Sequence, residues 1–147
     1  MTQTDLALSD LYLADETAWL EAMAELIDSG NRTDLDYANL REYLTDMANR
    51  DRREVNSRLV QLLMHILKWE HQPDHRSGSW QSSIFDQQFE LNLLVGRGVL
   101  RNHAEDVFAE EYPVAVKRAA AETGLGIEAF PRECAYSLDE LLSFDPK

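Results

Sequence analysis

The stretch LLMHILKWEHQPDHRSGSW, residues 62–80, joins the end of one amphipathic segment to the start of another. Its apolar residues continue a helical series that begins earlier, and this series consists of Val55, Leu59, Leu62, Leu63, Ile66, Leu67 and Trp69. A face this wide is typical of a central helix that touches several neighbours. The helix is predicted to end near His71, because Pro73 disfavours the helical conformation at the residue before it. The next helix is predicted to open after residues 77–79, so the stretch forms a helix hairpin.

Two helices are predicted before this hairpin, each from apolar residues at helical spacing. In the first helix these residues are Trp19, Leu20, Met23, Leu26 and Ile27. In the second helix they are Tyr37, Leu40, Leu44 and Met47. Either Asp15 or Ser9 is predicted to cap the first helix, and the Ser-Gly-Asn sequence at 29–31 to stop it. The second helix begins at about Asp36 and is predicted to end at Asn49, because asparagine tolerates the left-handed conformation of a helix stop.

Two longer helices are predicted from the hairpin onward. The inward residues of the first are Trp80, Ile84, Leu91 and Leu94. Gly96 and Gly98 are predicted to end it. The second runs from about Leu100 to Thr123, with Gly124 as its C-cap. Pro113 lies inside this helix and removes one backbone donor, which predicts a kink there or a division into two shorter helices.

The remaining residues complete the predicted fold class. The chain is predicted to be loop-like through Pro131, and the sequence SLDE at 137–140 then reads as a capping box that opens a short helix through Leu142. No stretch alternates polar and apolar residues for long enough to predict a sheet. The sequence therefore predicts an all-α fold, an antiparallel bundle of about five helices plus a short C-terminal helix. Its 147 residues are predicted to form one helical domain, residues 1–147.

The charge is strongly negative and unevenly distributed. The formal net charge is −13, and residues 1–49 alone carry eleven acidic and two basic residues. A potential of this sign repels phosphate backbones, so nucleic-acid binding is not expected. No apolar run approaches the ~20 residues of a membrane helix, and the first residues lack the basic region of a signal peptide. A single cysteine fits a reducing compartment, so we expect a cytoplasmic protein that does not bind membranes.

Three of the four histidines lie in the hairpin stretch and raise the hypothesis of a metal site. His71 and His75 are four residues apart, but Pro73 ends the helix between them, so they do not share a helical face. His65 and His71 are separated by about 240° around a helix and point to different sides. No metal site is therefore predicted. His65 is expected to be buried and hydrogen-bonded, and His71 and His75 to be exposed.

A second candidate site brackets the hairpin turn and consists of Lys68, Arg76, Ser77, Ser79 and Trp80. In a structural interpretation, Trp69 packs against Trp80 and pins the two helices together. Lys68 then compensates for the dipole of its helix, while Ser77 or Ser79 caps the next one. In a functional interpretation, the same residues form a basic, aromatic-lined pocket that accepts an anion or small ligand at a helix N-terminus. Both interpretations remain open at this point.

The other reactive residues do not form a catalytic motif. Cys134 lies in PRECAYS, residues 131–137, without a histidine adjacent in sequence. A nucleophilic thiolate needs a positive neighbour or a helix N-terminus, so a structural cysteine is favoured. The chain also lacks a P-loop and the paired Glu-x-x-His motifs of di-iron bundles. No catalytic residue or cofactor is assigned, and an enzyme is the less favoured interpretation.

The sequence resembles a bacterial family named domain of unknown function 29, which is common in cyanobacteria and proteobacteria. The segments LYLADETAWLEAMAELIDSG, RLVQLLMHILKW with the following QP, RS and SW, AAAETGL and FPRECAYSLDELL carry the resemblance in the order of the family. Gly78 and Pro113 depart from its pattern, which often has a basic residue at the first position and a helix former at the second. The resemblance implies an all-helical fold and no established activity, cofactor or catalytic residue.

These observations favour a small acidic helical module that acts through protein–protein contact, as an adaptor or as an inhibitor of a basic partner. The partner is expected to be another protein or a second copy of the chain. The alternative is an anion-binding or small-ligand-binding protein, or an enzyme, that uses the turn between the third and fourth predicted helices.

Overall fold

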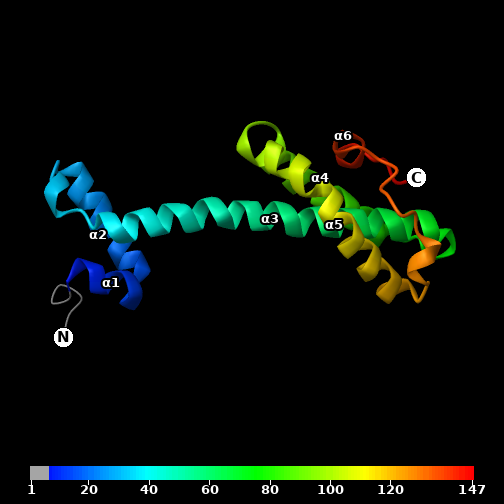
Figure 1. Cartoon of the computed structure of the whole chain (residues 1–147), viewed down its shortest axis with the longest axis horizontal. Helices are drawn as coiled ribbons and strands as arrows, with labels where there is room; N and C mark the ends of the chain where they lie inside the picture. The colour runs from blue at the N-terminus through cyan, green and yellow to red at the C-terminus, as the bar shows by residue number, and fades with distance from the viewer. Residues whose placement is uncertain (1–6) are drawn as a thin grey trace. The chain divides into compact units, whose positions relative to one another are not determined.

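The computed structural model describes residues 7–147, which form six α-helices and no β-strand, so the fold is all-α (Figure 1). The α-helices are α1 (Leu8–Ala14), α2 (Glu16–Asp28), α3 (Tyr37–His71), α4 (Gly78–Val95), α5 (Val99–Thr123) and α6 (Leu138–Leu142). Three short 3-10 helices join them: η2 (Arg32–Asp34), η3 (Pro73–His75) and η4 (Ile127–Ala129). The chain divides into two compact units, Met1–Asn49 and Arg50–Lys147. The single domain over residues 1–147 that the sequence predicts stays a prediction.

The first unit is built around one tryptophan. Its core consists of Leu11, Tyr12, Trp19 and Met23. Trp19 is fully buried, and its ring centroid lies 4.7 Å from that of Tyr12 in an edge-to-face arrangement. The indole Nε1 donates a hydrogen bond of 3.1 Å to Asp36 Oδ2, so the one polar atom of the buried ring has a partner.

Asp36 also immediately precedes α3 and accepts hydrogen bonds from its first turn. Its Oδ1 accepts a hydrogen bond from the backbone N–H of Asn39, and its Oδ2 accepts one from the Asn39 side chain. Burial acts to raise the pKa of this carboxyl, but the hydrogen bonds from Asn39 and Trp19 outweigh it and leave the pKa lowered. The carboxylate is therefore stabilised by the fold, and this contribution is present above the ordinary pKa of 3.8 and lost as the pH falls below it.

The first predicted helix, α2, is capped by Asp15 and not by Ser9. Asp15 breaks the helical path between α1 and α2, and its side chain accepts a hydrogen bond of 3.1 Å from the backbone N–H of Ala18. Asp15 is therefore the N-cap of α2, and Ser9 lies inside α1, a short helix that the sequence did not predict. Gly30, with a φ of 76°, follows the end of α2 as predicted.

The predicted stop at Asn49 is wrong. The second and third predicted helices are one continuous helix, α3, of 35 residues. Asn49 lies inside α3, and it does not adopt the left-handed conformation of a helix stop, because among the described residues only glycines have a positive φ. The residues that follow it are mainly charged and contain neither glycine nor proline, so nothing local ends the helix. Two residues of the predicted inner face, Tyr37 and Leu44, are each 59% exposed, because the packed side of this part of α3 is centred on Leu40 and Tyr43 instead.

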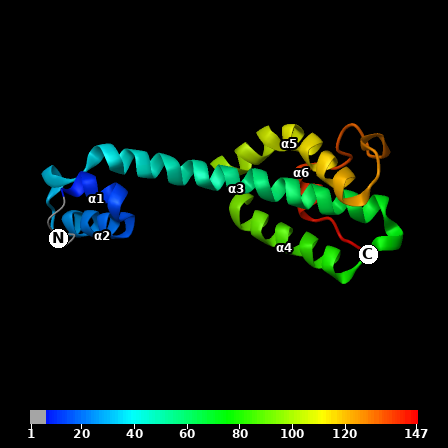
Figure 2. The same cartoon turned by 90° about the horizontal axis from the view of Figure 1, so that it is seen from below.

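The second unit contains the larger core. Figure 2 shows α4 running back along α3 and α5 returning beside them, which is the predicted antiparallel order of neighbours. The residues of α3 that face this core are Val55, Leu59, Val60, Leu62, Leu63, Met64, Ile66, Leu67 and Trp69. Ile84, Leu91 and Val95 pack on them from α4. Buried Gln88 donates hydrogen bonds to the carbonyls of Leu141 and Phe144, which ties the C-terminal segment to α4.

Pro113 does not divide α5. The helix is continuous from Val99 to Thr123, so of the two predicted alternatives the division into two shorter helices is wrong, and the kink stays a prediction. Pro113 and Ala109, whose carbonyl loses its donor, are both exposed, so water is able to hydrate the free carbonyl. Two predicted caps are confirmed. Gly124 ends α5 in the left-handed conformation, and Ser137 and Glu140 form both hydrogen bonds of the capping box of α6.

Candidate functional site

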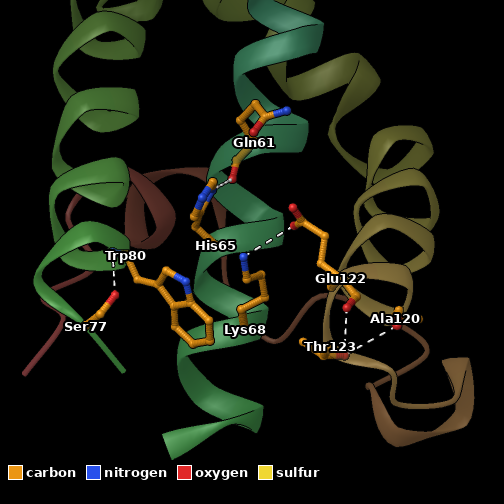
Figure 3. A network of polar contacts seen from close by, with 9 residues as sticks. Gln61, His65, Lys68, Ser77, Trp80, Ala120, Glu122 and Thr123 are labelled. Carbon is orange, nitrogen blue, oxygen red and sulfur yellow. Dashed lines mark hydrogen bonds and ion pairs between the residues drawn. The ribbon is translucent and has the colours of Figure 1, made fainter. Parts of the chain in front are cut away.

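The predicted site lies at the corner between α3 and α4, and its central cation is paired with a distant acid (Figure 3). Lys68 is only 8% exposed, and its Nζ lies 3.3 Å from Glu122 Oε2 on α5. The same ammonium lies 4.7 Å from the centroid of the Trp80 ring, within the range of a cation–π contact. The charge of Lys68 is therefore balanced by the protein itself.

The Arg76 side chain also has partners within this corner. Its Nε donates a hydrogen bond of 2.8 Å to the carbonyl of Trp69, and its guanidinium carbon lies 4.9 Å from the centroid of the Trp69 ring. Each indole of the corner therefore has its own cation–π contact, and Trp80 packs against the core cluster that includes Trp69. A free carbonyl at the end of α3 attracts a cation, which explains why Arg76 folds back over it.

The choice between the two serines is decided in favour of Ser77. Its Oγ accepts a hydrogen bond of 3.2 Å from the backbone N–H of Trp80, which makes it the N-cap of α4. Ser79 lies in the first turn of α4, is exposed, and forms no side-chain hydrogen bond within the described residues. The predicted capping function therefore belongs to one serine only.

Replacing Ser77 by alanine is expected to lower the free energy of unfolding by about 1 kcal/mol, since one N–H at the start of α4 loses its acceptor. Ser79→Ala is the matched control and is expected to change the stability by less than about 0.5 kcal/mol. Urea denaturation followed by circular dichroism measures both. Equal destabilisation by the two substitutions would show that Ser77 is not the cap.

These contacts favour the structural interpretation of the corner. Lys68 and Arg76 have partners, and the Ser77 hydroxyl is used by the helix. The anion-binding alternative stays a prediction. Lys68 already pairs with Glu122, and Arg76 already donates its Nε–H to the carbonyl of Trp69, so an anion at this corner competes with existing interactions.

The histidines are dispersed. Half-buried His65 contacts the carbonyl of Gln61 through Nδ1 at 2.8 Å, so this nitrogen carries the proton. His71 was expected to be exposed but is half-buried, with its ring edge-to-face against Phe130. His75 is exposed in η3, and His103 Nε2 lies 2.6 Å from Asn56 Oδ1. Within residues 7–147, no three His, Cys, Asp or Glu side chains are placed to hold a metal ion.

Cys134 is half-buried beside two tyrosines. It lines a small cavity of about 20 Å³ together with Tyr112 and Tyr136. Burial raises the pKa of the Cys134 thiol, which lowers its thiolate fraction at neutral pH. Tyr136 donates a hydrogen bond of 2.6 Å to Glu70 Oε2, and this bond raises the pKa of Tyr136 to about 12. These surroundings of Cys134 are typical of a structural cysteine.

A surface that the sequence interpretation did not identify lies on the outer side of α4. Phe85, Phe89 and Leu93 are 47%, 65% and 70% exposed. They are spaced by four residues and form one stripe, which we call the α4 stripe, away from the core residues Ile84 and Leu91. The signal was present as a second apolar series on the same helix. One inward series is sufficient to predict a helix, so the second series does not change the predicted element.

The architecture defines an all-α protein whose larger unit consists of antiparallel helices around the C-terminal part of α3. None of the described helices is both long enough and apolar enough to cross a membrane. The chain belongs to the family described as Domain of unknown function DUF29, whose model matches residues 11–145. No curated protein and no solved structure matches the chain.

Proposed function

We propose that the protein is an interaction module, an adaptor or inhibitor, which binds a basic protein partner through the α4 stripe. The exposure of Phe85, Phe89 and Leu93 supports this proposal most directly. Large apolar side chains that stay in water contribute little to folding. They contribute roughly 1.5–3 kcal/mol each when a partner buries them. Aromatic residues are also enriched among the residues that dominate binding energy.

The geometry of the stripe fits a helical recognition mode. Residues at i, i+4 and i+8 of a helix form the line of anchors with which an amphipathic helix enters an apolar groove or packs on another helix. The stripe by itself is smaller than the ~800 Å² per partner of a stable interface. It therefore forms the apolar centre of the proposed contact, and polar residues around it form the rim.

The charge beside the stripe indicates the chemistry of the partner. Asp86 and Glu90 follow Phe85 and Phe89 by one residue and lie along one edge of the stripe. Asp86 is exposed, and Glu90 forms a long ion pair of 3.9 Å with Arg58. With a net charge of −13, the protein attracts basic surfaces at long range, which speeds association.

The double substitution Phe85→Ser with Phe89→Ser is expected to abolish this binding without unfolding the protein, because both side chains are exposed. The measurement is a pull-down from native lysate with the wild-type chain as bait. Leu44→Ser is the matched control, since Leu44 is an exposed apolar residue on α3 in the first unit. The expected result is a basic, stoichiometric partner that the wild type and the control retain and the double variant loses.

Two outcomes would contradict the proposal. One is that the wild type and the double variant retain the same proteins, which would assign the capture to another surface. The other is a homodimer of the purified wild type that the double variant converts to a monomer in analytical ultracentrifugation. The stripe would then be a contact between copies of this chain instead of a site for a different protein.

A further inference from the structure

A groove in the second unit lies between α5 and the segment from η4 to Arg132. Its volume is about 570 Å³. Tyr112, Val116 and Phe130 form its base, and all three are buried. Ile127, which is 59% exposed, and Pro113 form its apolar sides. A concave apolar surface of this size is within the range of small-molecule sites, roughly 300–1,000 Å³.

Interactions of the lining residues with one another and with α3 hold the two sides of the groove in place. Tyr112 on α5 donates a hydrogen bond of 2.7 Å to the carbonyl of Pro131 in the opposite segment. Phe130 packs edge-to-face on His71, with the ring centroids 5.0 Å apart. Gly124, at a φ of 77°, turns the chain at the end of α5 toward this segment. The groove is thus preformed, which reduces the entropic cost of binding.

The charged residues at the rim are mainly basic. Lys117 and Arg132 line the groove and are exposed, and neither forms an ion pair within the described residues. Glu128 also lines it, but its carboxylate lies over Gly126, where a Cβ would clash with it. A groove with two available cations and one acid is unusual on a protein with a net charge of −13. Its polarity is opposite to that of the chain as a whole.

We propose that this groove binds a small amphipathic carboxylate, a molecule with one anionic head and an apolar body of about ten carbons. The body lies against Val116, Ile127 and Phe130, and the head pairs with Lys117 and Arg132. A guanidinium group accepts a carboxylate through two parallel hydrogen bonds, and an adjacent ammonium adds a second charge. A groove of this volume holds one such molecule. A protein partner instead needs a contact area of ~800 Å² on each side.

The inference does not depend on the proposed function, because the groove and the α4 stripe share no residue. The probe for its test is decanoate at concentrations below micelle formation, titrated into the ¹⁵N-labelled full chain and followed by NMR. Saturable shifts are expected for residues 112–117 and 127–132. Decanol and decyltrimethylammonium, which keep the apolar chain but lack the carboxylate, are expected to bind about tenfold or more weakly.

Substitutions separate the head from the body of the ligand. Lys117→Glu combined with Arg132→Glu is expected to weaken decanoate binding by at least about tenfold. Arg118→Glu is the matched control, because Arg118 adjoins Lys117 in sequence but lines a different hollow with Arg53 and Asn56. Ile127→Asp places a charge in the apolar wall and is expected to abolish binding. All four substituted positions are exposed, so circular dichroism should show an unchanged fold.

Three results would overturn the inference. The first is no saturable decanoate binding. The second is equal affinity for decanoate and decyltrimethylammonium, which would indicate surfactant adsorption only. The third is that the Arg118→Glu control and the Lys117/Arg132 double variant weaken decanoate binding equally. That result would show that Lys117 and Arg132 act only through the overall charge of the protein.

Discussion

Replacing Trp19 by alanine is expected to unfold the first unit of the protein and to leave the second unit folded. Truncating a buried tryptophan typically costs about 3–5 kcal/mol. Trp19 is fully buried, contacts the rings of Tyr12 and Tyr43, and donates a hydrogen bond to Asp36. Among the described residues, the core of this unit has three other buried apolar residues, so little remains to hold α1 and α2 together.

Hydrogen exchange measured by mass spectrometry tests this expectation peptide by peptide. Peptides from residues 16–28 should lose protection in the Trp19→Ala variant, and peptides from α4 and α5 should keep it. Leu13→Ala is the matched control, since Leu13 is 89% exposed and should have almost no effect. Unchanged protection of residues 16–28 would contradict the expectation. Loss of protection in both units together would instead support the single domain that the length of the chain predicts.

Replacing Leu91 by alanine is expected to destabilise the second unit by about 2–5 kcal/mol. Leu91 has no solvent exposure and packs in the core with residues of α3 and α5. The loss has two parts, the transfer free energy of the removed atoms and the cavity that close-packed neighbours do not fill completely. An effect of this size is a large fraction of the 5–15 kcal/mol that stabilises a typical domain.

The same helix provides the control two residues further along. Leu93 is 70% exposed, and Leu93→Ala should change the free energy of unfolding by less than about 0.5 kcal/mol. Urea denaturation followed by far-ultraviolet circular dichroism measures both variants. A loss below about 1 kcal/mol for Leu91→Ala would show that α4 is not firmly packed on α3. By contrast, Leu93→Ala is expected to weaken binding of the proposed partner, which separates stability from function on one helix.

Much of the fold was predictable because its signals are local. Gly124 ends α5, and the capping box begins α6, through atoms only a few residues apart. These features are therefore predictable from the local sequence. The continuity of α3 through Asn49 was not predictable in this way. An asparagine is compatible with a helix end and with a helix interior, and the continuous α3 shows which applies here.

The candidate sites were predictable to a smaller extent. The sequence identified Lys68, Arg76 and Trp80 as neighbours of one turn, and it indicated a capping serine. Glu122, the acid that pairs with Lys68, is 54 residues away, and no local pattern indicates it. The groove beside Lys117 and Arg132 depends in the same way on a segment that folds back toward α5.

The sequence by itself determined the helical class, most helix boundaries and the strongly acidic charge, because periodicity, capping and composition depend on neighbouring residues. Only the tertiary structure decided which apolar residues outside the predicted inward series stay in solvent. Ile84 and Phe85 are adjacent in the chain, yet one is inside the core and the other is in solvent. Burial and ion pairing depend on which distant elements pack against each face, and those contacts form only when the chain folds.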